Sequence, residues 1–366
     1  MKVNRIYLSG WRNYDMGTAE FSPGINVISG INAQGKTNLL EAVYMLTGGV
    51  SFRTRFDKEL IGFGFSQGEI LADVEAMGRV QTVRIVLKRG QRKSITLNGV
   101  KKTGGELSDS LKAVLFCPDD LNVIKSGAAE RRRLLDMAIV QLRPGYAALL
   151  RDFGRVYENK SRILKDWREK PDLLDALDDF SQSLCRVSAQ IIRYRASYSL
   201  RLAEKAAAVH REFSGGAEAL TAEYKTVSTV TDPTASVQQI TEELYAHQAA
   251  HRQAEIDSQS CLTGAHKDDL LLAINGKAAR EFASQGQART AALSLKLAER
   301  EIFKNETGEY PVLLLDDVLS ELDSRRRDFV LNRIGGGQTL ITCCEEDEIA
   351  EKTGGKVLTV RNGVIG

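Results

Sequence analysis

The sequence predicts an α/β protein in which β-rich ends of the chain flank a mostly helical insert. Three observations support this. Strand-like segments and one strong helix fill the first 100 residues, the chain is mostly helical from about Glu130 to His251, and β-character returns from about Cys261. A chain of 366 residues has room for about two domains. We expect one lobe from residues 1–115 and 258–366 and an inserted, mostly helical lobe from residues 116–257.

The elements are expected in a definite order. The segments KVNRIYLSGW and GINVISG have strand character, and a helix is predicted over Lys36–Leu46, ending at Gly48-Gly49. The segment from Gly68 to Lys102 resembles antiparallel strands, with LNGV as a hairpin turn. A short break at Gly215-Gly216 and VSTVTDPTAS interrupts the helical insert. The remaining strands are predicted in DDLLLAING, PVLLL, QTLITCC and GKVLTVRNGVIG.

Composition narrows the class of protein. The chain is 43% hydrophobic and 27% charged, which is typical of a globular protein, and its net charge of +2 identifies no partner. The sequence has no long apolar run that would predict a signal peptide or a membrane span, so we expect a cytoplasmic location. The five cysteines form no C-x-x-C pair, so we expect reduced thiols and no structural metal. Local basic patches are the candidate contacts for nucleic acid. They are Lys88–Lys93, Lys101-Lys102, Arg131–Arg133 and Arg325–Arg327.

A phosphate-binding loop is the strongest motif. The stretch GINAQGKT fits G-x-x-x-x-G-K-[ST] between a β-branched strand and a helix, which is the context of a P-loop. Its amides would cradle the phosphates of ATP, Lys36 would neutralise β/γ charge and act in catalysis, and the Thr37 hydroxyl would ligate Mg²⁺. The predicted nucleotide contacts here are Gly30, Ile31, Asn32, Ala33, Gln34, Gly35, Lys36, Thr37 and Asn38.

A second carboxylate motif follows near the C-terminus. The apolar strand in YPVLLLDD ends at Asp316, and a carboxylate at this position is the predicted ligand of Mg²⁺. The adjacent Asp317 is the predicted catalytic residue, which would polarise a water molecule.

The octet ASQGQART starts another predicted helix. Ser284 is a suitable N-cap, and Ala291, Leu295, Ala298 and Ile302 form one apolar stripe. The backbone N–H groups at such an end attract anions. The predicted nucleotide-contacting residues are Ser284, Gln285, Gly286 and Gln287, although an ordinary capped helix remains the alternative.

A P-loop, a Ser/Gly/Gln-headed helix and a strand ending in Asp, in that order, resemble the ATP-binding-cassette ATPases. In that family the signature reaches the γ-phosphate of ATP held by the other subunit, and Ser320–Asp323 looks like its D-loop. Longer stretches resemble the RecF recombination-mediator family. These are LSGWRNY, GINVISGINAQGKTNLLEA, SFRT, FCPDDLNVIKSGAAERRRLLD, GAHKDDL and ASQGQARTAALSLKLAE.

The resemblance implies a two-lobed ATPase head similar to that of SMC proteins. It implies a homodimer formed on ATP, DNA binding at gaps, partnership with RecR and RecO in loading RecA, roles in recombinational repair, replication and the SOS response, and no membrane partner. By analogy with SMC-type heads, Arg12 and Asn13 would contact phosphate or nucleotide, although a surface Arg beside a turn Asn is as good a reading. His266 is better explained as a hydrogen-bonded structural histidine.

The sequence departs from the family pattern at a few positions. Asp317 stands where many cassette ATPases have Glu, and Thr342 and Cys343 stand where a His often follows the last core strand. Gln285 replaces a glycine of the signature, and Ala265 and Lys267 replace an expected Pro and Arg. These departures leave the predicted phosphate loop intact and bear on the roles expected in hydrolysis.

Three other functions compete with the DNA-repair ATPase. A P-loop kinase or GTPase would need a base-reading motif such as N-K-x-D, which the sequence lacks, and a transporter ATPase would need a coupling Gln and membrane partners. A structural DNA clamp without turnover is separated from the ATPase by measuring turnover with and without DNA.

Overall fold

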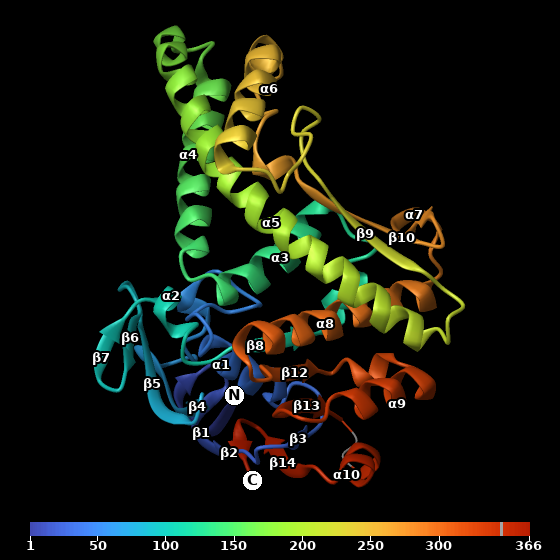
Figure 1. The fold of residues 1–366 in the computed structure, drawn as a ribbon. Coiled ribbons are helices and arrows are strands. Elements are labelled where there is room, and N and C mark those ends of the chain that lie inside the picture. The colour runs from blue at the N-terminus through green and yellow to red at the C-terminus, as the bar shows by residue number, and fades with distance from the viewer. Residues whose placement is uncertain (345–346) are drawn as a thin grey trace. The chain divides into compact units, whose positions relative to one another are not determined.

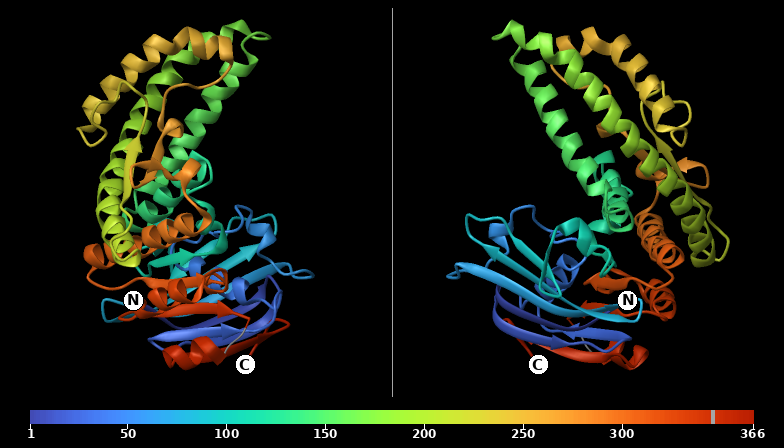
Figure 2. Two further views of the ribbon diagram at one scale, coloured as in Figure 1. Left: turned by 90° about the vertical axis from the view of Figure 1, so that its right-hand side faces the viewer. Right: turned by 60° about the vertical axis from the view of Figure 1, so that its left-hand side comes forward.

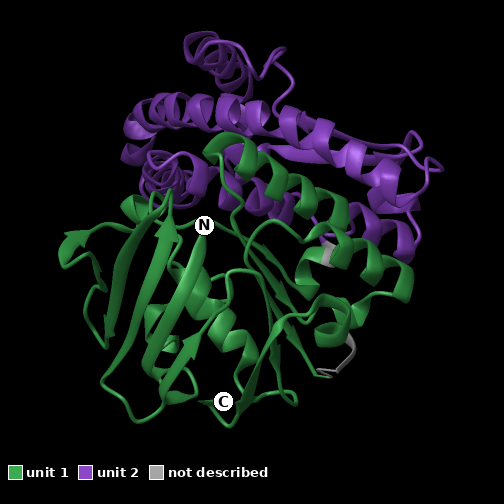
Figure 3. Cartoon of the chain, turned by 60° about the horizontal axis from the view of Figure 1, so that its bottom comes forward, with its two compact units in different colours: residues 1–122, 292–366 green, residues 123–291 purple. Residues whose placement is uncertain are grey.

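The computed structural model describes residues 1–344 and 347–366, and the chain divides into two compact units (Figures 1 and 3). Unit 1 consists of residues 1–122 and 292–366, and unit 2 of residues 123–291. The second junction differs from the predicted one. Residues 258–291 lie in unit 2, because strand β10 (Asp269–Ile274) within them pairs with strand β9 (Leu220–Lys225) of the insert.

Unit 1 contains an antiparallel sheet with the strand order β2-β1-β4-β5-β6-β7. Burial alternates along β4, as expected for strands with one face on the core. The predicted LNGV turn is confirmed, with Asn98 and Gly99 both at positive φ between β6 and β7. The strands are β1 (Lys2–Trp11), β2 (Tyr14–Glu20), β4 (Gln67–Ala76), β5 (Arg79–Lys88), β6 (Ser94–Leu97) and β7 (Val100–Lys102).

A second sheet of unit 1 has the order β15-β14-β3-β13-β12-β8 and is parallel except for the β14–β15 hairpin. Every residue of β12 and β13 is buried, which is typical of parallel strands covered on both faces. The strands are β3 (Ile25–Ser29), β8 (Ala113–Phe116), β12 (Val312–Asp316), β13 (Thr339–Cys343), β14 (Lys356–Arg361) and β15 (Val364–Ile365).

Helix α1 (Lys36–Met45) joins the two sheets of unit 1. It contacts β1 of the antiparallel sheet and β12 and β13 of the parallel sheet, and its residues Leu39, Leu40 and Val43 are fully buried. The apolar stripe predicted for the helix that follows Ser284 is also buried in α8. The other helices with residues in this unit are α2 (Gly104–Leu107), α8 (Gln285–Thr307), α9 (Ser324–Arg333) and α10 (Asp347–Thr353).

Unit 2 is built around the long helix α5 (Leu177–Phe213), which packs against α4, α6 and β9 (Figure 2). None of the helices in the described residues is long and apolar enough to span a membrane. The other elements are α3 (Ala128–Leu142), α4 (Tyr146–Asp166), α6 (Val237–Ser258), α7 (Ala279–Phe282), β9 (Leu220–Lys225), β10 (Asp269–Ile274) and β11 (Lys277–Ala278). Short 3₁₀ helices in the two units are Asp57–Glu59, Pro118–Asn122, Pro171–Ala176, Ala265–Lys267 and Leu319–Glu321.

A buried polar network joins two sequence motifs in unit 2. Arg195 of α5 donates to Asp136 from the ERRRLLD stretch and to Asp268 from GAHKDDL, in each case at 2.8 Å. Asp268 is fully buried and also accepts hydrogen bonds from the hydroxyls of Tyr224 and Thr226. The two motifs therefore have a structural role, since a buried charge is tolerated only when it is paired and hydrogen-bonded.

One of the predicted DNA-binding patches, Arg131–Arg133, is wrong. Arg131 is 3% exposed and forms a two-pronged ion pair with Asp269, with N–O distances of 2.7 and 2.9 Å. Arg132 donates to the backbone oxygen of Asp268, and only Arg133 of the three is exposed. The run of arginines is explained by packing of α3 against β10, so it is not a solvent-facing basic patch.

Candidate functional site

The predicted phosphate loop connects the end of β3 to the start of α1. Gly30 and Gly35 have φ of +153° and +119°, a region that favours glycine. A Cβ at Gly30 would lie 2.3 Å from the Val360 oxygen, and one at Gly35 would lie 2.8 Å from the Asn13 amide. Backbone geometry and the close approach of Val360 and Asn13 thus both require the two motif glycines.

Lys36 lies inside this loop. Its side chain is buried, and its ammonium donates to the backbone oxygen of Gly30 and lies 3.4 Å from both the Ile31 oxygen and the Cys344 Sγ. A phosphate in the loop would offer this cation a charged acceptor, which makes a stronger hydrogen bond than neutral carbonyls do.

Thr37 and Asp316 meet at the end of the parallel sheet. The Thr37 hydroxyl donates to Asp316 Oδ1 at 2.8 Å, and the Thr342 hydroxyl donates to the same oxygen at 3.0 Å. The register pairs Asp316 with Thr342 and Cys343 with Ser29, so the carboxyl ends of β12, β13 and β3 lie side by side. Ligands of open α/β sheets bind at this edge.

The electrostatics of Asp316 suit a cation site. Burial raises the pKa of this carboxyl above its ordinary value and adjacent Asp317 adds to the rise, whereas the two hydroxyls and Arg53 oppose it. A hydroxyl and a carboxylate are the hard oxygen ligands that Mg²⁺ prefers, and one or two such protein ligands are usual. The residues present therefore fit a magnesium ion shared with phosphates.

Asp317 has a backbone conformation unusual for its residue type. Its φ is +54°, in the left-handed region that Asp and Asn tolerate better than most residues. The conformation is held by its N–H, which donates to the Thr342 hydroxyl at 2.8 Å, and by Ser320, whose hydroxyl donates to the Asp317 backbone oxygen at 2.6 Å. The side chain is half-buried beside Asp316, where a carboxylate can accept a proton from water.

The predicted N-terminal contacts have different surroundings. Asn13 donates to the Gln34 oxygen and accepts from Asn38, each at 2.8 Å, so it holds the phosphate loop from outside. The Arg12 guanidinium is engaged by both carboxylate oxygens of Glu41, at 2.8 and 2.7 Å, and by the Glu59 backbone oxygen. Arg12 thus bridges α1 and the segment at Glu59. A direct contact of Arg12 with nucleotide stays a prediction.

Sequence reasoning missed a group of side chains around helix α1. Fully buried Glu41 also accepts from the Ser51 hydroxyl at 2.5 Å, and Arg53 donates to Asn38 Oδ1 at 2.8 Å. These contacts explain the SFRT stretch, and the charge of Arg53 reaches Asp316. Cys344, just beyond β13, donates to Asn32 Oδ1 at 3.0 Å. The signal for Arg53 was present in the motif, whereas nothing local pointed to Cys344.

The predicted signature segment lies in unit 2. The Ser284 hydroxyl accepts from the Gln287 N–H at 3.2 Å while the Gln287 side chain accepts from the Ser284 N–H at 2.9 Å, which is a capping box. The N-cap prediction for Ser284 is confirmed. Gln287 also donates to Glu218 at 2.8 Å, and Ser284 and Gln285 are exposed. The first-turn N–H groups of α8 are thus presented at the surface of this unit.

The structure therefore brings Lys36, Thr37, Asp316, Asp317 and Asn13 together within unit 1. The predicted D-loop leads into α9, which Asp323 caps by accepting from the Arg326 N–H. His266 of unit 2 hydrogen-bonds the Cys261 oxygen at 3.0 Å and packs on Tyr157, as expected for a structural histidine.

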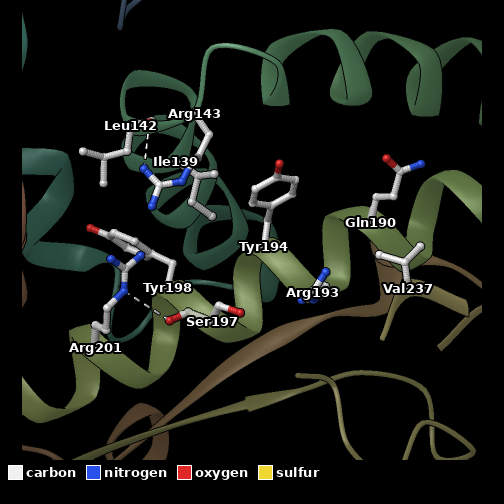
Figure 4. A pocket seen from close by; sticks show the side chains of 10 residues that line it. All are labelled: Ile139, Leu142, Arg143, Gln190, Arg193, Tyr194, Ser197, Tyr198, Arg201 and Val237. Atoms are coloured by element: carbon white, nitrogen blue, oxygen red, sulfur yellow. Dashed lines mark hydrogen bonds between the residues drawn. The ribbon is translucent and has the colours of Figure 1, made fainter. Parts of the chain in front are cut away.

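Unit 2 also contains a pocket of about 360 Å³ between α3, α5 and the start of α6 (Figure 4). It shares no residue with the phosphate loop. Burial and the nearby Arg143 lower the pKa of Arg201. The lining residues are Ile139, Leu142, Arg143, Gln190, Arg193, Tyr194, Ser197, Tyr198, Arg201 and Val237.

Comparison with known sequences gives a consistent family. Residues 2–364 match the model of the RecF/RecN/SMC N terminal domain. A DNA replication and repair protein RecF from Acetivibrio thermocellus is 38% identical over 365 residues, covering 99% of this chain and 98% of the relative. Another from Desulforamulus reducens is 39% identical over 343 residues, covering 93% and 92%.

Solved structures agree with the sequence comparison. The structure described as the recombination mediator protein RecF-ATPrS in the RecFOR pathway superposes with a TM-score of 0.92 at 33% identity, covering 100% of this chain and 97% of that one. The corresponding RecF-ATP structure gives 0.90 at 33% identity, with coverage of 100% and 96%. An Smc head domain from Pyrococcus furiosus has a TM-score of 0.55 at 18% identity and 99% and 94% coverage, which shows a shared fold.

Proposed function

This chain belongs to the RecF family of DNA replication and repair proteins, and on that premise we propose that it is an ATP-driven switch that binds DNA. In the proposed cycle, ATP closes a homodimer, the dimer holds DNA at a gap, and slow hydrolysis reopens it. The observation that carries the proposal is that Lys36, Thr37 and Asp316 lie close together at the carboxyl ends of the parallel strands. The chain is also similar to a solved structure described as RecF-ATP.

The nucleotide part of the proposal assigns each residue a task. The loop amides and Lys36 would bind the β- and γ-phosphates, and Asn13 would keep the loop in shape from outside. Thr37 and Asp316 would hold Mg²⁺, which neutralises charge on the phosphates. Asp317 would orient and deprotonate the attacking water, with its carboxylate fixed by the strained backbone that Thr342 and Ser320 support.

The dimer part rests on the signature segment. The exposed start of α8 offers backbone N–H groups and the Ser284 hydroxyl to an anion, and helix N-termini favour negative charge. We assign this end to the γ-phosphate of ATP held by the partner subunit. ADP lacks that phosphate, so it would leave the two copies apart.

Family membership supports the DNA and partner assignments that we propose. DNA binding would depend on ATP and fall steeply with salt, because cations that contact phosphates release counterions. Exposed Lys88, Arg89 and Arg92 are the candidate contacts. RecR and RecO would bind the DNA-bound dimer, and RecA loading at the gap would follow.

One experiment tests the switch. Light scattering of the full chain with Mg-ATP, with Mg-ADP and without nucleotide should give a doubled molar mass with ATP alone. Phosphate release should be slow and rise with gapped DNA. An unchanged mass in all three states would remove the dimer cycle. ATP-induced closure without any phosphate release would instead identify a DNA clamp that does not turn over.

A further inference from the structure

A fully exposed aromatic side chain stands on a rigid turn in unit 1. Phe63 is 100% exposed. The turn that carries it is closed by a hydrogen bond of 3.2 Å from the Phe65 N–H to the Gly62 oxygen, and Gly64 in its third position has a φ of +82°. Gly62 is itself tied to the Gly10 oxygen at 2.8 Å. The ring is thus held out into solvent by a backbone that is fixed on both sides.

A basic turn lies directly against this aromatic turn. Arg89 donates its Nε to the Phe65 oxygen at 3.1 Å and its Nη2 to the Gly62 oxygen at 3.4 Å. Lys93 pairs with Asp57 at 2.9 Å, which fixes the other end of the basic turn to the segment before Phe63. The guanidinium of Arg89 therefore lies beside the two carbonyls that flank Phe63.

A second aromatic ring and more cations extend the patch. Phe56 is 55% exposed, and the Lys58 ammonium lies 5.8 Å from the centre of its ring. Residues 53–67 and 88–93 together contain seven Lys or Arg and two acidic residues. We call the following set the aromatic-basic surface. It consists of Phe56, Lys58, Phe63, Lys88, Arg89 and Arg92.

The combination of chemistry identifies its ligand. Cations alone suit any nucleic acid backbone, but exposed aromatic rings gain nothing from a duplex, whose bases are already stacked on one another. Unpaired bases stack on aromatic side chains, while a basic surface tracks their phosphates. Single exposed hydrophobic residues are common on proteins, and what sets this patch apart is that both rings lie among cations on fixed backbone.

We propose that the aromatic-basic surface binds the single-stranded part of a DNA gap, with an unpaired base stacked on Phe63 and its phosphates on Lys88, Arg89 and Arg92. This inference rests on the proposed DNA binding at a gap and adds the surface that contacts the unpaired bases. The surface distinguishes a gap from intact duplex because only the gap offers a free base face.

The test compares two DNA substrates under one condition. Binding of labelled gapped duplex and of blunt duplex is measured by fluorescence anisotropy with the full chain and Mg-ATP. Phe63→Ala should weaken binding to gapped DNA by about 5- to 100-fold, the range expected for losing one base–aromatic stack, and leave blunt duplex unchanged. Phe63→Trp should restore gap binding. Val80→Ala, which truncates a 61% exposed side chain at the far end of β5, is the control and should alter neither.

A spectroscopic signal reports stacking directly. A 2-aminopurine in the gap should lose fluorescence when the wild-type protein binds, and keep it with Phe63→Ala. The double variant Lys88→Gln, Arg92→Gln should weaken both substrates and lower the salt slope by about 2, because two phosphate contacts are removed.

The outcomes separate this inference from the function beneath it. Wild-type protein that binds neither substrate with ATP would overturn the proposed DNA binding itself. Wild-type binding with an unchanged Phe63→Ala variant would overturn the stacking site and leave the surface to a protein partner. An equal loss on both substrates would also overturn it, since stacking acts on the gap alone. Light scattering confirms that each variant still forms the ATP dimer.

Discussion

The hydroxyl of Thr37 donates a hydrogen bond of 2.8 Å to the carboxylate of Asp316, although 279 positions separate the two residues in the chain. The contact joins the first turn of α1 to the end of β12. Because β13 lies between β3 and β12 in the sheet, the two residues approach across the carboxyl end of that middle strand. Each prediction about nucleotide chemistry depends on this meeting point.

Replacing Lys36 should strongly weaken ATP binding. Lys36→Ala deletes the cation that the motif supplies to the β- and γ-phosphates, and a charge-assisted hydrogen bond contributes about 1.5–3 kcal/mol, so affinity should fall at least tenfold. Calorimetric titration with Mg-ATP measures it. The matched control is Lys356→Ala, an exposed lysine at the start of β14 in the same sheet, which should bind normally. Affinity for ATP that survives Lys36→Ala within a few-fold would reject the loop assignment.

Asp317→Asn should retain ATP binding and lose turnover. Asparagine tolerates the left-handed backbone at this position, so the substitution changes the side-chain chemistry and keeps the fold. Loss of a general base typically slows a reaction by about 10²–10⁴-fold. Single-turnover phosphate release gives the rate, and light scattering should show a long-lived ATP dimer. Wild-type turnover in this variant would exclude Asp317 from the mechanism.

Ser284→Arg should block dimer closure and leave ATP binding intact. A guanidinium would fill the space needed by the partner's γ-phosphate, while the phosphate loop of each monomer is unaltered. Ser236→Arg is the matched control, because Ser236 caps α6 in the same unit by accepting from the Gln239 N–H. Each change should cost about 1 kcal/mol of stability, but only the first should abolish the ATP dimer, ATPase and DNA binding together. If Ser284→Arg doubles its mass on ATP, the segment is an ordinary cap.

Asp268→Ala should strongly destabilise unit 2. The substitution leaves Arg195, which is 5% exposed, with one carboxylate instead of two, and orphans the hydroxyls of Tyr224 and Thr226. Breaking a buried ion pair costs about 3–5 kcal/mol. Urea unfolding measures the loss. Asp178→Ala removes an exposed pair with Arg252 and should cost less than about 1 kcal/mol. Similar losses in the two variants would mean that the network contributes little.

Acid should destabilise the protein partly through His266. Burial lowers the pKa of His266 to about 4, with repulsion from Lys267, Arg132 and Lys160 adding to the shift. Between the ordinary histidine pKa of about 6.5 and this value, the unfolded chain binds a proton that the folded protein does not, so stability falls as the pH falls through that window. His266→Gln should flatten the pH dependence of the unfolding free energy there. The slope would stay the same if His266 were protonated in the fold.

Contiguous motifs predicted the strand–loop–helix around Lys36 and the strand end at Asp316, because each motif is bound to one backbone geometry. The GINAQGKT stretch needs a strand before it and a helix after it, and Asp316 needs only to end an apolar strand. The strand β9 was missed because LTAEYK contains Ala, Glu and Leu, which favour helices, and its pairing with β10 is non-local. The arginine run at Arg131 was misread because consecutive charges do not show which face of a helix is buried.

In the proposed switch, the position of Arg12 between α1 and the Glu59–Leu60 segment would make the binding of ATP and of DNA interdependent. Its guanidinium pairs with Glu41 of α1, while its backbone N–H and its Nη1 donate to the Leu60 and Glu59 oxygens, two and three residues before the turn that begins at Gly62. A ligand that moves the Glu59–Leu60 segment would then change the free energy of binding at the phosphate loop, and the reverse would also hold. Thermodynamic linkage is reciprocal. The factor by which bound ATP raises the affinity for DNA would therefore equal the factor by which bound DNA raises the affinity for ATP. In the proposed switch the DNA-bound form would therefore have the higher affinity for ATP, and hydrolysis, whose rate linkage does not set, would end that state.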